Sequence, residues 1–286
     1  MFKRVVKLLI VLLLILVIAS FPDALEPRSG NIIVLKPYVF PDNIQAFFKN
    51  LSDGSLGTYK TGSQHRSIAA DIGDNVLTSF LLMFTSMLVS VATSLLVGAF
   101  FPRSRISKAV YAIFGFLSAI PQFILIILLI FGGVSIYKLT GYRVITLSMD
   151  KKFADFLFPV FILSIVSTSY LLKLTAAKYN HIGSEDYVRT GLSKGLSKPY
   201  LNLHHIFKNL RPYFVADLKK TLSLTAGSLF IVEYLFNILG VTRFIFADYQ
   251  FAAVAVGFLS IVLITMVVYY SILLLLFLFE KGFVYE

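Results

Sequence analysis

The chain has 286 residues, of which 57% are hydrophobic and 14% are charged, and its mean hydropathy is +0.82. This composition is too apolar for a soluble domain and predicts a membrane protein that crosses the bilayer several times. The net charge of +11 does not call for a nucleic-acid partner, because basic cytoplasmic loops give a membrane protein the same balance. The lack of cysteine excludes disulfides, thiolate metal sites and cysteine nucleophiles.

The four histidines all lie in polar segments, at His65, His181, His204 and His205. A histidine proton relay inside the bilayer is therefore not expected. The adjacent His204 and His205 point about 100° apart on a helix, so they cannot chelate a metal together. We predict no metal site.

The N-terminal region, residues 1–75, is expected to hold a first transmembrane helix and an extracytoplasmic loop. Basic residues at 3, 4 and 7 precede the apolar run 8–21, which fits either a retained span or a secretory signal peptide. We favour a retained span with its N-terminus in the cytoplasm. The polar stretch 22–75 contains one amphipathic helix at residues 43–50, capped by Asp42.

Residues 54–61 imitate a phosphate-binding loop without forming one. Such a loop needs Gly before its Lys so that the backbone can wrap a phosphate, and here Tyr59 precedes Lys60. The chain is therefore not expected to bind nucleotide or to be an enzyme.

The second span is predicted at residues 76–101, where small and hydroxylated side chains favour helix packing over a solute path. The link at 102–108 carries Arg103, Arg105 and Lys108 and no acidic residue, which places it in the cytoplasm.

The third span is predicted at residues 109–137, and Pro121 in its interior should bend the helix. Such a bend can serve gating or be a fixed structural feature, and both alternatives stay open. An outer loop follows at 138–155, and the fourth span is expected at 156–172.

The fifth and sixth spans are predicted at residues 213–238 and 251–279. Glu233 lies on the order of 20 Å along the helix axis from Lys220, within apolar neighbours. An ionisable group in that position is a functional candidate, either structural or in contact with solute or a gate. The six spans form an all-α helix bundle with both termini in the cytoplasm.

Residues 183–212 form the longest polar, basic stretch between two spans. Ser184 can cap a short helix with Glu185 and Asp186 in its first turn, and Gly195 can end that helix in a left-handed conformation. A second helix can begin at Ser197, with Pro199 in its first turn. The pattern predicts a helix, a tight turn and another helix at the membrane surface.

A family resemblance is carried by residues 186–190 and 194–197, followed by His205 and Asn209. They resemble the cytoplasmic coupling loop of permease subunits of ABC importers, and they are most similar to the dipeptide, oligopeptide and nickel permeases. Residues 118–123 and 232–236 resemble further segments of that family. Gly191 departs from the pattern, since the family usually has Ala there.

The resemblance implies a type I importer fold, with a core permease domain at 76–286 and a coupling loop at 183–212. It also implies a second related permease, two cytoplasmic ATPase subunits that use ATP and Mg²⁺, an extracytoplasmic solute-binding protein, and a bacterial cell membrane. Peptides are the expected solutes, with nickel or another small solute as the alternative. The residues expected to couple to the ATPase are Glu185, Asp186, Tyr187, Val188, Arg189, Thr190, Gly191, Lys194, Gly195 and Leu196; Pro121 and Glu233 are the candidates for translocation or gating.

Three other classes of protein are alternatives to an ABC importer subunit. An ATP-independent secondary transporter would normally place several ionisable groups in the bilayer, whereas this sequence offers chiefly Glu233. An intramembrane hydrolase would need a base beside Ser228, and none is visible in the sequence. A sensor or assembly protein would differ in not binding ATPase subunits.

Overall fold

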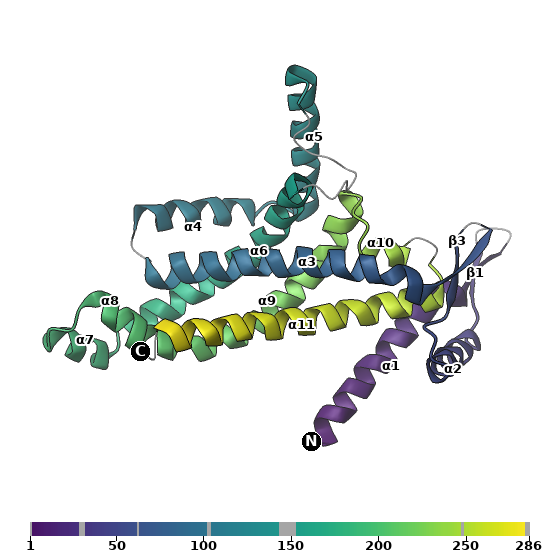
Figure 1. The fold of residues 1–286 in the computed structure, drawn as a ribbon, viewed down its shortest axis with the longest axis horizontal. Coiled ribbons are helices and arrows are strands. Elements are labelled where there is room, and N and C mark those ends of the chain that lie inside the picture. Colours follow the sequence, from purple (N-terminus) through teal and green to yellow (C-terminus); the bar gives the residue numbers. More distant parts are fainter. Residues whose placement is uncertain are drawn as a thin grey trace. The chain divides into compact units, whose positions relative to one another are not determined.

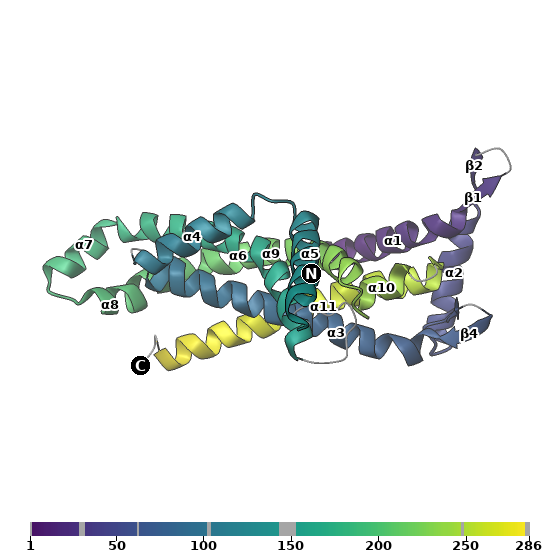
Figure 2. The same cartoon turned by 90° about the horizontal axis from the view of Figure 1, so that it is seen from above.

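The computed structural model of the chain describes residues 2–28, 32–61, 63–101, 104–142, 153–246 and 249–283 (Figures 1 and 2). The chain divides into two compact units. Unit 1 comprises Met1–Ser79 and Leu239–Ile264, and unit 2 comprises Phe80–Ile238 and Thr265–Glu286. The sequence analysis divides the chain at residue 75 according to membrane topology, and that division stays a prediction.

Unit 1 combines helices with two short hairpins that the sequence analysis did not predict. Its elements are α1 (Phe2–Ala24), β1 (Leu25–Arg28), β2 (Ile32–Leu35), α2 (Val39–Ser52), β3 (Thr58–Thr61), β4 (Gln64–Ser67), the start of α3 (Ile68–Leu95), α10 (Val241–Phe246) and the first half of α11 (Phe251–Phe283). β1 pairs antiparallel with β2, and β3 with β4. The predicted amphipathic helix at 43–50 is present as α2 but begins earlier, at Val39, so Asp42 lies in its first turn instead of capping it.

Among its described residues unit 2 contains helices joined by turns, and no strand. It contains the remainder of α3, the π-helical turn η1 (Leu96–Phe100), α4 (Arg105–Leu117), α5 (Gln122–Thr140), α6 (Phe153–Gly183), α7 (Asp186–Ser193), α8 (Lys198–Tyr200), the π-helical turn η2 (Leu201–Ile206), α9 (Phe207–Leu235) and the second half of α11. α6 and α9 pack along one another (Figures 1 and 2).

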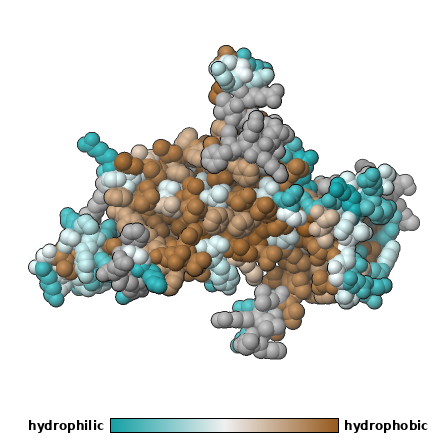
Figure 3. All heavy atoms as spheres, in the orientation of Figure 1, coloured by the Kyte–Doolittle hydropathy of each residue, from teal (hydrophilic) through white to brown (hydrophobic). Residues whose placement is uncertain are grey.

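Four helical stretches among the described residues are long and apolar enough to cross a membrane: Ile68–Phe100, Gln122–Thr140, Phe156–Gly183 and Phe251–Gly282. The apolar part of α1, Leu9–Ala24, is shorter. The fifth expected span lies in α9, which contains Asp217, Lys219 and Lys220 and is correspondingly less apolar. In Figure 3, hydrophobic side chains cover most of the visible surface of the long helices.

The third expected span is not one bent helix. α4 ends at Leu117, residues 118–121 form a turn, and α5 begins after Pro121, whose φ of −53° and ψ of 133° are not helical. Proline disfavours a helical conformation in the residue before it and lacks an amide hydrogen, so it starts a helix more readily than it continues one. The prediction of a proline inside a continuous helix is wrong at this position, and α5 turns away from α4 (Figure 1).

The basic link expected at 102–108 is shorter than predicted. Arg105 and Lys108 already belong to α4, which Ser104 caps by accepting a hydrogen bond from the Ser107 amide at 3.0 Å. Arg103 lies outside the described residues, as does most of the expected outer loop at 138–155.

Hydroxyl side chains join α3, α6 and α9 inside unit 2. Ser90 in α3 donates to the Ser164 carbonyl at 3.3 Å and accepts from the Thr168 hydroxyl at 3.0 Å. Ser167 in α6 and Thr225 in α9 lie 2.6 Å apart, hydroxyl to hydroxyl, and both are buried. Small hydroxylated residues let membrane helices approach closely while satisfying their own polar groups. The packing role expected for such residues is the one seen here.

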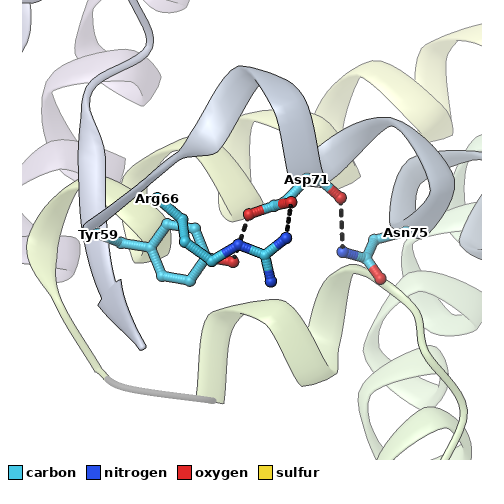
Figure 4. Close-up of polar contacts among 4 residues, drawn as sticks. All are labelled: Tyr59, Arg66, Asp71 and Asn75. Atoms are coloured by element: carbon cyan, nitrogen blue, oxygen red, sulfur yellow. Dashed lines mark hydrogen bonds and ion pairs between the residues drawn. The ribbon is translucent and has the colours of Figure 1, made fainter. Parts of the chain in front are cut away.

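The β3–β4 hairpin is fastened to the first turns of α3 through Asp71 (Figure 4). Its carboxylate accepts hydrogen bonds from the Tyr59 hydroxyl at 2.9 Å and from Arg66 at 2.8 Å, and the Asn75 amide donates to its backbone carbonyl at 3.2 Å. Burial, and then the hydrogen bond to Asp71, raises the pKa of the Tyr59 hydroxyl. Tyr59 therefore stays a proton donor well into the alkaline range.

The Gln250 side chain also holds this hairpin. Its amide accepts from the Lys60 backbone N–H at 2.8 Å and donates to the Lys60 carbonyl at 2.9 Å. One side chain thus satisfies both polar groups of a strand residue, as a neighbouring strand would. The segment that imitates a phosphate loop is a turn followed by strand β3. Within that strand, both backbone polar groups of Lys60 are hydrogen-bonded to Gln250.

Candidate coupling site

The loop between the fourth and fifth expected spans forms a helix, a tight turn and a second helix, as the sequence predicts. The first helix is α7. Its N-cap is Glu185, one residue later than expected, with φ −65° and ψ 150°. The Ser184 hydroxyl instead donates to the His181 carbonyl at 2.7 Å, at the end of α6. The prediction of Ser184 as the cap is therefore wrong by one residue, because the preceding helix uses that side chain.

The turn after α7 is a Schellman motif. The Gly195 amide donates to the Leu192 carbonyl at 3.0 Å, and the Leu196 amide donates to the Gly191 carbonyl at 3.1 Å. Gly195 has a φ of +83°, and Lys194 is the C-cap. This geometry requires a left-handed residue after the cap, and Gly adopts it without the steric cost of a Cβ atom. The conformation predicted for Gly195 is confirmed.

α7 buries one face against the rest of unit 2. Val188 packs with Ala99, Ile182, Ile206 and Leu210, a group of buried side chains that we call the coupling core. The coupling core connects the short helix to η1, to the end of α6 and to the start of α9. α7 is therefore held against three other elements by close-packed side chains.

Gly191 also lies on the buried face of α7. A Cβ atom at this position would be 2.6 Å from Leu201 Cδ2, so a larger residue requires that flexible side chain to move. The departure from the Ala usual in the family therefore has a packing reason in this chain: η2 comes close to α7 here.

The rest of the α7 surface is exposed. Tyr187 and Leu192 are exposed large side chains, and Arg189 is exposed beside Asp186, with 3.7 Å between the guanidinium and carboxylate groups. A surface ion pair of this kind contributes little to stability. These side chains are accessible from solvent, and hydrophilic side chains gather over this end of the molecule (Figure 3).

Tyr187 and Asn209 are brought together from the two ends of the loop. The Asn209 amide donates to the Tyr187 hydroxyl at 2.9 Å. Both residues belong to the sequence pattern on which the resemblance rests. Their contact ties the exposed face of α7 directly to the first turn of α9.

The second helix begins at Ser197 as its N-cap, with Pro199 in its first turn, as predicted. It then runs without interruption through η2 into α9, and Pro212 lies inside α9. The Asn202 amide of η2 donates to the Ala99 carbonyl of η1 at 3.2 Å, so the two π-helical turns are joined. The sequence did not reveal the π-helical turns, because their hydrogen bonds differ from α-helical ones by a single residue.

A hollow of about 800 Å³ opens between α7 and α8 on one side and the ends of η1 and α6 on the other. Its walls are mostly apolar, and Arg189, Lys198, Ser184 and Asn202 are among the polar residues that line it. The described residues contain no group of three or more His, Asp or Glu that could hold a metal ion.

Pro121 lies away from the coupling loop along the chain, between α4 and α5. Two hydrogen bonds join this turn to α6: the Ser169 hydroxyl donates to the Ser118 hydroxyl at 3.0 Å, and the Gln122 amide donates to the Ile162 carbonyl at 3.2 Å. Pro121 thus marks an anchored break between two helices. Its part in gating stays a prediction.

Glu233 lies near the end of α9 and has no exposed surface, although it is ionisable. Its backbone carbonyl accepts from the Ile238 amide at 2.9 Å, and Asn237 between them has a φ of +56°. α9 therefore ends in the same type of motif as α7, with Asn in the left-handed position. Complete burial favours the structural alternative for Glu233, and its role stays a prediction.

Two residues of this region were missed as site candidates, Arg211 in α9 and Glu280 in α11. Their side chains form an ion pair, with 2.6 Å between Arg211 Nε and Glu280 Oε1. The signal in the sequence was the position of Glu280, four residues after Leu276 on the buried face of α11.

Comparison with known proteins covers the same part of the chain. The family described as binding-protein-dependent transport system inner membrane component matches residues 90–285. These residues include α6 to α9 and the loop between α6 and α9. This is a family of transport components, and its members are not enzymes.

The chain is also similar to a probable peptide ABC transporter permease protein of Sinorhizobium fredii, with 26% identity over 174 residues. The match covers 58% of this chain and 54% of that protein, so the chain spans about half the length of the curated relative that it matches. The family match covers more than half of the chain. The long apolar helices of the chain agree with a multi-pass membrane protein. The chain therefore belongs to the family of binding-protein-dependent transport system inner membrane components, the permeases of ABC importers.

Proposed function

We propose that the chain is one membrane half of an ATP-driven importer and that α7 is its contact with a separate ATPase subunit. The observation that carries this proposal is the two-faced packing of α7. Val188 anchors one face in the coupling core, while Arg189, Thr190 and Ser193 are exposed on the opposite side of the helix. A helix held rigidly on one side and exposed on the other is suited to transmit a partner's movement.

The proposed assembly contains a second related permease, two cytoplasmic ATPase subunits and an extracytoplasmic solute-binding protein. ATP and Mg²⁺ are bound by the ATPase subunits. Closure of the ATPases moves α7, and the coupling core transmits that movement to α6 and α9 and so opens the bundle to the outside. Hydrolysis of ATP resets the inward-facing state.

The contact with the ATPase can be tested by crosslinking. The chain has no cysteine, so Leu192→Cys introduces a single thiol at an exposed position of α7. A bifunctional thiol reagent should join this residue to an ATPase subunit co-expressed in the same membrane. Thr140→Cys, at the end of α5, is the matched control and should not crosslink. The absence of any crosslink between Leu192→Cys and an ATPase subunit would contradict the proposal.

We propose peptides as the solute class, supported by the resemblance of the coupling loop and by the name of the Sinorhizobium fredii protein. Nickel or another small solute is the alternative. The two alternatives can be distinguished with the solute-binding protein that co-purifies with the chain. Its binding of a peptide pool is compared with its binding of Ni²⁺. An ATP-independent secondary transporter would instead show uptake that follows a proton gradient and ignores ATP.

We further propose a bacterial cell membrane location with both chain ends and α7 in the cytoplasm. The basic residues Arg105 and Lys108 at the start of α4 support this orientation. An impermeant thiol reagent applied to intact cells should leave Leu192→Cys unlabelled and should label a cysteine placed at Ser52 in α2. Labelling of Leu192→Cys from outside would reverse the orientation.

A further inference from the structure

The second half of α11 buries one stripe of its surface in unit 2. Val268, Ile272 and Leu276 are buried and follow one another at four-residue intervals, so they share one face of the helix. Glu280 is the next member of this stripe, and its side chain is only 5% exposed. A carboxylate therefore occupies the position at which the apolar pattern requires another aliphatic side chain.

The partner of this carboxylate is Arg211, on α9. The two side chains form an ion pair at 2.6 Å between Nε and Oε1. Within the described part of the chain Arg211 Nε makes no well-aligned hydrogen bond. The two opposite charges attract one another across this contact.

Stability alone does not account for this pair. Glu280 is almost completely buried while 42% of the Arg211 side chain is exposed, so the carboxylate loses most of its water and gains a partly screened attraction in return. Glu280 also lies in the last turn of α11, where the helix dipole disfavours a negative charge. The pair fixes which turn of α9 meets which turn of α11, and apolar side chains would specify that register less strictly.

The neighbours of the pair lead directly to the coupling loop. Leu210, next to Arg211, packs in the coupling core together with Val188 of α7. Phe279, next to Glu280, packs against Phe207 at the start of α9, with 5.7 Å between the ring centroids. The last turn of α11 is thus held against the same turns of α9 that carry the coupling core.

We propose that the Arg211–Glu280 ion pair couples α11 to the movement of α7, so that the coupling loop drives α11 together with α9. Arg211 and Glu280 are positioning residues in this scheme, because they act through the helices that they join. The inference rests on the proposed function for its role in transport. The mechanical connection itself can be tested on the chain alone.

The first experiment measures a distance in the full chain in lipid nanodiscs. Spin labels at Ser193→Cys in α7 and Leu278→Cys in α11 report on the two helices, and both positions are exposed. The unsubstituted pair should give a narrow distance distribution. Glu280→Gln should broaden it, because a neutral side chain at this position no longer attracts the Arg211 guanidinium. The swapped pair Arg211→Glu with Glu280→Arg should restore the narrow distribution, whereas Lys281→Gln, an exposed neighbour, should leave it unchanged.

A variant that removes both charges separates coupling from packing. Arg211→Met with Glu280→Leu keeps the volume of the contact, and such replacements usually preserve the fold. We expect this variant to unfold at a temperature close to that of the unsubstituted chain and to show the broad distribution. A folded double variant with a narrow distribution overturns the inference, since packing alone would then hold the two helices in register.

The second experiment uses the assembled transporter in proteoliposomes and a radiolabelled pentapeptide pool as the probe. Uptake per ATP hydrolysed should fall about tenfold in Glu280→Gln and recover in the swapped pair. ATP-dependent uptake that is unchanged in Glu280→Gln overturns the inference and leaves the proposed function standing. Uptake by the unsubstituted transporter that ignores ATP contradicts the proposed function, while the distance measurement still decides whether the ion pair connects the helices.

Discussion

The Asn209 side chain donates a hydrogen bond to the Tyr187 hydroxyl across 2.9 Å, and this contact joins the short helix α7 to the long helix α9. Tyr187→Phe removes the hydroxyl and preserves the ring. We expect a loss of about 1 kcal/mol in the free energy of unfolding, measured as a fall of about 3 °C in the melting temperature.

The same substitution should weaken the link between ATP hydrolysis and uptake, because α7 then has one less connection to α9. Tyr142→Phe is the matched control, since Tyr142 is an exposed tyrosine beyond the end of α5. Equal melting temperatures and equal uptake for the two variants would show that the Tyr187 hydroxyl does not hold the loop.

Gly195 is the residue whose conformation ends α7. Gly195→Ala should destabilise the loop by about 1–2 kcal/mol, because an L-residue with a Cβ atom is strained at φ +83°. Crowding is not the cause, since no atom lies within 4 Å of the position that a Cβ would occupy. Gly195→Asn should be tolerated better, as Asn visits this region of backbone conformation more readily.

Hydrogen exchange of the amides of α7 measures this effect directly. Gly183→Ala is a useful control, since Gly183 has no positive φ and a Cβ there would meet only Ile206 at 3.8 Å. Faster exchange in Gly183→Ala than in Gly195→Ala would be inconsistent with backbone strain as the cause.

Gly257 marks a close approach of α11 to α10 in unit 1. A Cβ atom at Gly257 would collide with the Ile245 side chain and lie 2.9 Å from its Cδ1 atom. Gly257→Ala should therefore destabilise the chain by about 1–3 kcal/mol, the usual cost of overpacking. The double variant Gly257→Ala with Ile245→Ala should recover part of the loss, as measured by thermal unfolding.

Gly227→Ala provides the comparison for that experiment, because the position of its Cβ is open and Ala favours helix. We expect it to be neutral or stabilising. A Gly257→Ala chain as stable as Gly227→Ala would mean that α10 can move away from α11 without cost.

The buried hydroxyl pair Ser167 and Thr225 offers a test of how α6 and α9 are held together. Thr225→Val removes one hydroxyl at nearly constant volume and should cost about 0.6–1.7 kcal/mol, the range measured for hydrogen bonds between membrane helices. Thr140→Val, at an exposed helix end, should have no measurable effect on unfolding in a mild detergent. A Thr225→Val chain that unfolds like the control would assign the α6–α9 contact to apolar packing alone.

The coupling loop was predictable because its signals are local. Gly195, Ser197 and Pro199 each specify backbone geometry within one turn, and the structure has the predicted turn and second helix at those residues. Ser184 was assigned wrongly as a cap because a competing acceptor, the His181 carbonyl, lies just before it. Element boundaries depend on such competition, which a sequence pattern does not resolve.

The contacts that were missed are those made between distant parts of the chain. The β3–β4 hairpin is stabilised by Asp71 and by Gln250, which lies 190 residues from Lys60. The pair Arg211 and Glu280 likewise comes from two different helices. The break before α5 was missed for another reason: a proline inside an apolar run fits a kink and a new helix start equally well.

The two π-helical turns have a consequence for how such loops change length during evolution. Each turn of η2 is closed by hydrogen bonds that span one more residue than an α-helical turn. A chain lacking one residue within Leu201–Ile206 can close the same turn as ordinary α-helix, without rotating Arg211 or Glu233 relative to their neighbours. Relatives of this chain can therefore lose a single residue here while the helices on either side keep their alignment.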